Sequence, residues 1–96
     1  MATSNPTTFL HGATHEITTS GTSTQTSIAV GEQTRQVRIA TTADAHVVRG
    51  KNPTATTSDA IFFASSVEYM DIKPGEKVAA IQNSAAGVVY VTELTK

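Results

Sequence analysis

The sequence predicts an all-β protein, a small antiparallel β-sandwich or jelly-roll-like barrel. Three observations lead to this prediction. β-branched residues are frequent, threonine above all, and their stiff side chains suit strands better than helices. Apolar residues are nowhere repeated at helical spacing over several turns. Short alternating segments are separated by turn residues at intervals typical of about seven or eight strands in a sandwich or barrel.

The start of the chain differs from the rest. Residues 1–13 have no hydrophobic period and contain Pro6 and Gly12, so we interpret them as a flexible N-terminal arm. Residues 14–96 are expected to form a single β domain, because a chain of 96 residues has the length of one domain. Phe9 and Leu10 are the large apolar residues of the arm, and we expect them to anchor it to the domain or to a neighbouring protein.

The first half of the domain contains four segments with the character of strands. Residues 15–20 and 24–30 come first, and the second of them alternates before it reaches a turn at Gly31. Residues 35–42 show the clearest alternation of apolar and polar side chains. Residues 45–50 follow after a short link, and we interpret them as the return strand of a hairpin.

The second half begins with a loop at residues 51–60, which are small, polar and without apolar period. A short apolar strand is expected at residues 61–66. Residues 67–72 and 77–82 flank Pro74 and Gly75, the residues that a type II turn prefers at its centre, and we expect a hairpin there. The last strand is expected at residues 88–94. The predicted core consists of Val37, Ile39, Val47, Phe62, Ile72, Val78, Ile81, Val89 and Val91.

The composition excludes several functional classes. A net charge of −1 lacks the basic excess of nucleic-acid-binding proteins, so we expect no direct contact with nucleic acid. No apolar segment approaches the roughly 20 residues that span a bilayer, and the start lacks the pattern of a secretory signal. We therefore expect synthesis in the cytoplasm and no membrane contact. With no cysteine and so few residues, the chain is expected to gain stability from partner subunits.

No set of residues indicates a reaction. The chain has three histidines, His11, His15 and His46, and the spacing of four between the first two places both on one face only in a helix. We therefore expect no metal site. Asp44 with His46 and a serine resembles a hydrolytic set in composition alone, and the strained turn that presents such a nucleophile is absent. We expect no catalytic residue, no cofactor and no enzymatic activity.

Four basic residues lie near one another in the sequence: Arg35, Arg38, Arg49 and Lys51. If Arg38 and Arg49 lie on paired strands, they share an edge or a face of the sheet. The planar guanidinium group suits pairing with acidic groups on a partner protein, and ordinary solvation is the alternative.

One long segment resembles a known family. The sequence "QVRIATTADAHVVRGKNPTATTSDAIFFASSVEYMDIKPGEKVAAIQ", with the final "GVVYVTEL", is similar to small structural proteins encoded beside the capsid genes of tailed bacteriophages. In that resemblance a strand with "AHVVRG" precedes a "PTAT" loop, an apolar strand and a "PGEKVA" hairpin. The resemblance covers residues 36–94.

The resemblance implies a virion component, a decoration or cement protein on the capsid surface. Such proteins are small β-sandwiches or jelly rolls, often trimers, and they bridge capsid subunits where these meet. The expected partners are the major capsid protein and further copies of this chain, with a trimer favoured. We expect Phe9, Leu10 and Phe63 to join the copies, and the arm and polar loops to bind the capsid.

Two alternatives remain open. The first is another part of the virion, such as a head-completion protein, a tail protein or the base of a fibre. The second is a free module that binds carbohydrates or another surface. Exposed aromatic rings commonly hold sugars, whereas this chain has no tryptophan and its phenylalanines and tyrosines lie mostly in apolar strands, where core packing is expected.

Overall fold

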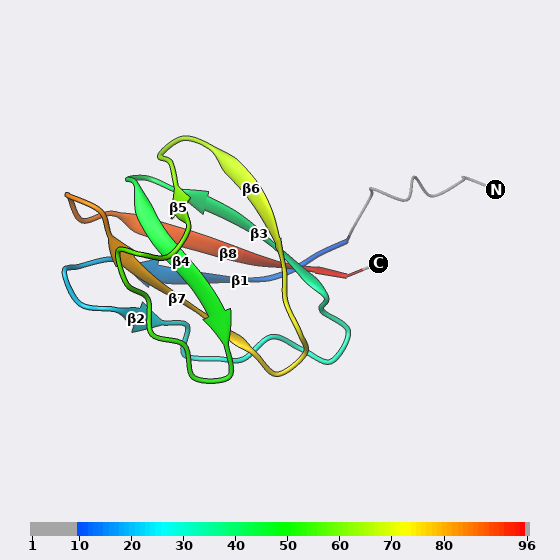
Figure 1. Cartoon of the computed structure of the whole chain (residues 1–96). Coiled ribbons are helices and arrows are strands. Elements are labelled where there is room, and N and C mark those ends of the chain that lie inside the picture. Colours follow the sequence, from blue (N-terminus) through cyan, green and yellow to red (C-terminus); the bar gives the residue numbers. More distant parts are fainter. Residues whose placement is uncertain (1–9, 96) are drawn as a thin grey trace.

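The chain crosses between two sheets at nearly every connection (Figure 1). The computed structural model describes residues 10–95, which contain eight strands. These are β1 (Leu10–Thr18), β2 (Thr24–Gln25), β3 (Gln36–Thr41), β4 (Ala45–Gly50), β5 (Ile61–Phe62), β6 (Val67–Asp71), β7 (Lys77–Gln82) and β8 (Val88–Thr95). Within this part of the chain, no helix is long and apolar enough to cross a membrane.

Each sheet has four antiparallel strands. Sheet A has the order β1-β8-β3-β6, and sheet B has the order β2-β7-β4-β5. Each strand of the first half pairs with one of the second half: β1 with β8, β2 with β7, β3 with β6, and β4 with β5. The chain can thus be traced as one long hairpin rolled into two layers, which is a jelly roll. The predicted all-β sandwich or jelly roll is confirmed.

The core lies between the two sheets. Val37 and Ile39 of β3 alternate with half-buried neighbours and point inward, as do Val89 and Val91 of β8. Full burial of such a side chain stabilises the fold by about 1.5–3 kcal/mol. Of the nine predicted core residues, eight are buried. The prediction is wrong for Ile81, which alternates with the core residues Val78 and Ala80 and therefore lies half-buried on the outer face of sheet B.

The outer face of sheet B is covered by the chain itself. Ala79 of β7 points away from the core side chains of its neighbours, yet it has no exposed surface. The loop 51–60 lies over this face, because the Asn52 side chain accepts a hydrogen bond from Gln25, which pairs with Ala79. The backbone N–H of Ala55 also donates to Ser23 Oγ at 2.8 Å. The loop therefore covers the outer face of sheet B around Ala79. On the outer face of sheet A, Thr92 and Leu94 of β8 are buried as well, whereas Tyr90 is exposed.

Both predicted hairpins are wrong. β3 pairs with β6 and β8, whereas β4 pairs with β5 and β7. β6 and β7 likewise belong to different sheets. The turn at Pro74 and Gly75 is confirmed, since Gly75 has a φ of +84° and Glu76 N–H donates to Lys73 O at 3.1 Å. This turn connects the two layers, because alternation and turn residues specify a strand and its end but not its partner.

Several strand boundaries also differ from the prediction, and the expected strand at residues 61–66 is reduced to the two residues of β5. Residues 10–13, which we predicted to belong to the arm, form the start of β1, because β8 is long enough to pair with them. Gly12 and Ala13 lie opposite Glu93 alone, so β1 contains a β-bulge there. The predicted strand 24–30 is reduced to β2, and Ile28 is exposed beyond its end. Residues 1–9 lie outside the described part of the chain.

Candidate protein-binding surfaces

The outer face of sheet A carries two rows of side chains that run across its strands. These side chains point outward, because Val91 and Ile39, their neighbours along the strands, point into the core. The first row consists of Glu16, Tyr90, Ala40 and Val67, and the second of Thr14, Thr92, Arg38 and Tyr69.

Large apolar side chains of these rows are exposed to solvent. Tyr69 is 59% exposed, Val67 45% and Tyr90 37%. Tyrosine and arginine are enriched in protein interfaces, whereas lysine and glutamate are depleted there. We call Arg38, Ala40, Val67, Tyr69 and Tyr90 the tyrosine face. Its composition is that of a surface that binds another protein.

The exposure of these rings corrects one prediction. We expected the aromatic residues to be packed mostly in the core, and this holds for Phe62, which is 8% exposed. Phe63, a predicted partner-binding residue, is exposed and lies in the link between β5 and β6. Tyr69 belongs to β6, which lies at the edge of sheet A. The sequence of β6 does not show which of its two faces packs on the core.

Arg38 and Arg49 do not lie on paired strands, so the condition under which they would share a face is not met. Arg38 lies on β3 in sheet A, whereas Arg49 lies on β4 in sheet B, so the two share neither an edge nor a face. Arg49 Nη1 lies 2.8 Å from Glu76 Oε1. The N–H of Lys73 lowers the pKa of Glu76 most, and Arg49 lowers it further against the opposing effect of burial.

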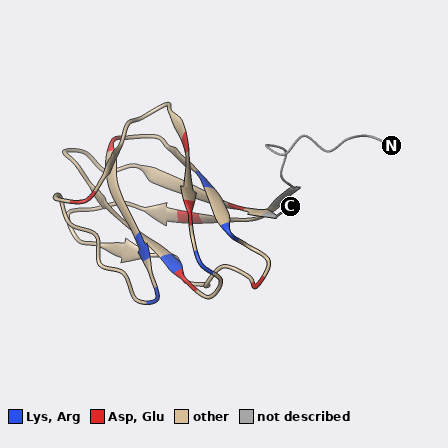
Figure 2. Ribbon diagram, turned by 45° about the vertical axis from the view of Figure 1, so that its right-hand side comes forward, with Lys and Arg blue, Asp and Glu red and all other residues tan. Residues whose placement is uncertain are grey.

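The fold nevertheless gathers basic residues at one end. The chain has seven lysines and arginines, of which Lys96 lies outside the described residues. The other six lie toward the end where the link from β6 to β7 crosses between the sheets (Figure 2). We call them the basic end: Arg35, Arg38, Arg49, Lys51, Lys73 and Lys77. Sequence reasoning missed Lys73 and Lys77, although both flank the predicted turn.

The opposite end carries acidic residues. Asp44 lies in the link from β3 to β4, and Glu68 lies in the half of β6 nearest that link. Among the described residues, the charged positions at this end are acidic (Figure 2). Glu32, Asp71, Glu76 and Glu93 also lie at the basic end, so its six basic residues exceed its acidic residues by two. The two ends thus differ in net charge, although the net charge of the whole chain is only −1.

Of the remaining predicted contact residues, the described Arg35 and Lys51 are not brought together with Phe63. Phe9 lies outside the described residues. Leu10 is the first residue of β1, and its side chain is likewise outside the described part. Arg35 is exposed just before β3, and Lys51 is exposed just after β4.

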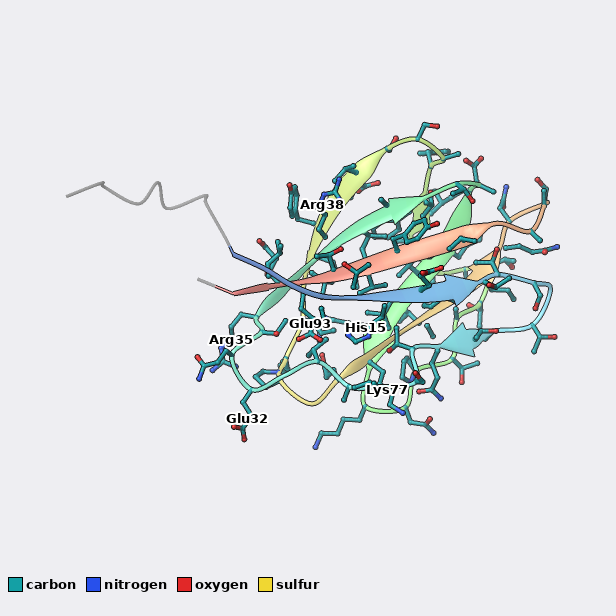
Figure 3. All side chains as sticks on the ribbon, turned by 180° about the vertical axis from the view of Figure 1, so that it is seen from behind. His15, Glu32, Arg35, Arg38, Lys77 and Glu93 are labelled. Carbon is teal, nitrogen blue, oxygen red and sulfur yellow. The ribbon has the colours of Figure 1, made fainter. Side chains whose placement is uncertain are left out.

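A carboxylate lies between the sheets at the basic end. Glu93 Oε1 accepts hydrogen bonds from Thr34 Oγ1 at 2.6 Å and from Gly31 N–H at 2.9 Å, and Oε2 lies 2.7 Å from His15 Nε2 (Figure 3). Burial raises the pKa of Glu93, but the bonds from Gly31, Thr34 and His15 outweigh it and lower the pKa overall. Glu93 follows the inward alternation of Val91, and this signal was available in the sequence.

His46 and Asp44 do not form a hydrolytic pair. His46 Nδ1 lies 2.9 Å from the carbonyl oxygen of Asp59, and its Nε2 lies 3.0 Å from Asn83 Oδ1. Asp44 Oδ1 instead accepts the backbone N–H of Ala64 at 2.7 Å. The Asp59 carbonyl raises the pKa of His46 most, followed by Asn83, against burial. These bonds hold the loops that contain Asp59 and Asn83 against the start of β4.

No protein-family model, curated protein or solved structure matches this chain. In the part of the chain that the structure describes, no three histidine, aspartate or glutamate side chains are placed to hold a metal ion. The tyrosine face and the basic end are the features from which we infer a function.

Proposed function

We propose that the chain is a non-enzymatic structural protein of a tailed-bacteriophage virion, a decoration or cement protein on the capsid surface. It binds where major capsid proteins meet and stabilises the head. The tyrosine face carries this proposal, because it exposes interface-type residues on one sheet of a sandwich whose other sheet is covered by its own loop. The jelly roll adds support, since the fold occurs in viral capsid domains, although a fold alone does not assign a function.

The proposed mechanism is binding by contact area and charge. A small protein that binds the assembled shell more tightly than free capsid subunits stabilises the shell by mass action. The tyrosine face joins copies of the chain, and the basic end binds acidic groups of the capsid protein. Arginine and lysine at a rim steer and orient such contacts. Many copies on one particle add their individual contributions.

The test compares capsids with and without the purified protein. Bound protein is expected to raise the temperature at which capsids release their contents, and equal temperatures in both preparations would contradict the proposal. Tyr90→Ser is expected to weaken the effect, because Tyr90 lies on β8 in the middle of the tyrosine face. Ile28→Ser is the matched control, because Ile28 is 63% exposed and lies outside the tyrosine face. Loss of the effect in both variants would argue for general destabilisation instead.

Another role in the virion is distinguished by copy number. A decoration protein is present in numbers comparable to the major capsid protein, whereas a head-completion, tail or fibre-base protein is present in few copies. Quantitative gel electrophoresis of purified virions gives the ratio. A ratio of a few copies per particle would replace the capsid assignment with one of these roles.

A free carbohydrate-binding module is a second candidate, and the structure gives it one specific observation. Tyr69 and Tyr90 expose their rings on a sheet face, where a sugar ring stacks readily. A glycan array with the purified protein tests this function. Binding that is lost in Tyr69→Ser and kept in Ile28→Ser would favour the module over the virion protein.

A further inference from the structure

We propose that a second copy of this chain packs on the tyrosine face, with the two sheets A face to face about a two-fold axis along β8. This inference rests on the proposed function only in treating the tyrosine face as a protein-binding surface. Its tests use the purified chain without capsids. Failure of the capsid assay and failure of self-association are therefore separate results.

The order of strands in sheet A defines the geometry. β8 lies between β1 and β3 (Figure 1). A two-fold axis along β8 therefore places β1 of one copy over β3 of its partner, and β8 over the partner's β8. Stacked sheets pack about 10 Å apart, and neighbouring strands within a sheet are about 4.8 Å apart.

Charge complementarity selects this axis. Glu16 lies on β1 and Arg38 on β3, in adjacent rows of the outer face. The rotation brings Glu16 over the partner's Ala40, and the partner's Arg38 lies two residues further along the strand, a distance of about 7 Å. An arginine side chain spans such a distance, so the pair can form. Symmetry produces the pair twice.

The alternative in-plane axis gives the opposite result. A two-fold axis in the plane of the interface and perpendicular to the strands places each strand over the same strand of the partner. Arg38 then faces the strand that carries the partner's Arg38, and Glu16 faces the strand that carries the partner's Glu16. Like charges that face each other across an interface are unfavourable. The axis along β8 is therefore the one that pairs acid with base.

The sizes of the side chains agree with this axis. Ala40 has the smallest side chain of the two rows, so the Glu16 carboxylate of the other copy has room above it. Tyr90 lies on the axis and meets the ring of the partner's Tyr90, and pairs of aromatic rings contribute about 0.5–1.5 kcal/mol beyond the buried area. The exposed Tyr69 and Val67 on β6 extend past the partner's β1.

The two-fold pair differs from the trimer that the resemblance implies. A three-fold axis brings two different surfaces of the chain into contact, so each surface needs a complement elsewhere on the molecule. The outer face of sheet A carries its own complement, since Glu16 and Arg38 lie on either side of β8. In the two-fold pair, most of the basic end remains outside the interface and available to a further partner.

Charge reversal tests the pairing of Glu16 with Arg38. Sedimentation equilibrium over a concentration series is expected to show a monomer and dimer in the unmodified chain. Arg38→Glu and Glu16→Arg are each expected to raise the dissociation constant about tenfold or more, and the double variant to restore it to within about threefold. Arg35→Glu is the control, because it makes the same charge change at an exposed residue outside the two rows.

Cross-linking tests the position of the axis independently. The chain has no cysteine, so a single introduced cysteine reports one position. Sheets about 10 Å apart are too distant for a disulfide, so a short bismaleimide is the appropriate reagent. Tyr90→Cys, on the axis, is expected to give covalent dimers. Tyr69→Cys, two strands away from the axis, is expected to remain monomeric under the same treatment.

Several outcomes would overturn the inference. A chain that stays monomeric at about 100 µM has no stable interface of this kind, because its dissociation constant then exceeds that concentration. A trimer mass excludes the two-fold pair, as does failure of the double charge reversal to restore association. Equal cross-linking of Tyr90→Cys and Tyr69→Cys rejects the axis along β8. Circular dichroism and thermal melting confirm that each variant is folded before its association is measured.

Discussion

His15 Nε2 lies 2.7 Å from Glu93 Oε2, which joins the first strand of the chain to the last. Both side chains are largely buried, with 13% of His15 and 12% of Glu93 exposed. The β-bulge at Gly12 and Ala13 lies directly opposite Glu93. The carboxylate also binds the link that precedes β3, so one side chain holds three segments together.

Replacement of Glu93 is therefore expected to destabilise the fold. In Glu93→Ala, Gly31 N–H, the Thr34 hydroxyl and His15 lose their common acceptor, at an expected cost of about 2–4 kcal/mol. Urea unfolding measures the loss. Glu68→Ala is the control, because Glu68 is exposed on an edge strand and its change is expected to stay within about 0.5 kcal/mol. Equal losses in both variants would contradict the role of Glu93.

The Glu93 carboxylate also makes the free energy of unfolding depend on pH in the acidic range. The folded pKa of Glu93 is lowered below its ordinary value of 4.5, as the hydrogen bonds and His15 outweigh burial. Its contribution is thus fully present above the ordinary value and is lost as the pH falls through the lowered folded value. We expect the difference in unfolding free energy between the unmodified chain and Glu93→Gln to shrink over that range. A difference that is constant from pH 7 to pH 2 would show that Glu93 does not titrate as proposed.

His46 is expected to give a pH dependence of stability opposite to that of Glu93. Its pKa is raised above 6.5, first by the Asp59 carbonyl and then by Asn83. A raised folded pKa gives a contribution that is complete below the ordinary value and is lost as the pH rises through the folded value. NMR titration of the His46 ring measures this pKa. Asn83→Ala is expected to lower it, whereas Asn52→Ala, whose side chain bonds to Gln25, is expected to leave it unchanged.

Much of the secondary structure was predictable, because alternation is local. Val37 and Ile39 mark the core face of β3, and Pro74 with Gly75 marks a turn that the structure contains. Pairing was not predictable, since it depends on residues far apart: Gln36 pairs with both Asp71 and Leu94. A link of three residues between β3 and β4 can either reverse a chain within one sheet or carry it to another, and the local sequence is the same in both cases.

The candidate surfaces could likewise be predicted only as far as they depend on local sequence. Arg38 was identified as a contact residue from its type, but its position beside Tyr69 depends on the pairing of β3 with β6. The basic end likewise depends on topology, because Lys51 and Lys73 are far apart in the sequence. We did not predict Tyr90 as a contact residue, because the residues before and after it in β8 are apolar. In such a strand the sequence alone does not show which side chains face the core and which face solvent.

Crowding at Gly87 gives the last prediction. A Cβ atom there would lie 2.7 Å from Ala43 Cβ, 2.8 Å from Thr42 Oγ1 and 3.1 Å from the backbone nitrogen of Ala43. Neither side can move freely, because Gly87 N–H donates to Thr19 Oγ1 and Val88 N–H donates to Thr42 Oγ1. Gly87→Ala is thus expected to destabilise the fold by about 3 kcal/mol.

Two other glycines separate this clash from backbone strain. Gly75 has a φ of +84°, and no atom lies within 4 Å of the place that a Cβ atom would take, so Gly75→Ala adds strain alone, about 1–2 kcal/mol. Gly21 has neither feature, and Gly21→Ala is expected to change stability by no more than about 0.5 kcal/mol. Urea unfolding of the three variants should give the order Gly87, Gly75, Gly21, from the largest loss to the smallest. A Gly87→Ala variant as stable as Gly21→Ala would show that the link between β3 and β4 moves away from β8 at little cost, and that the close approach of the two is not required by the fold.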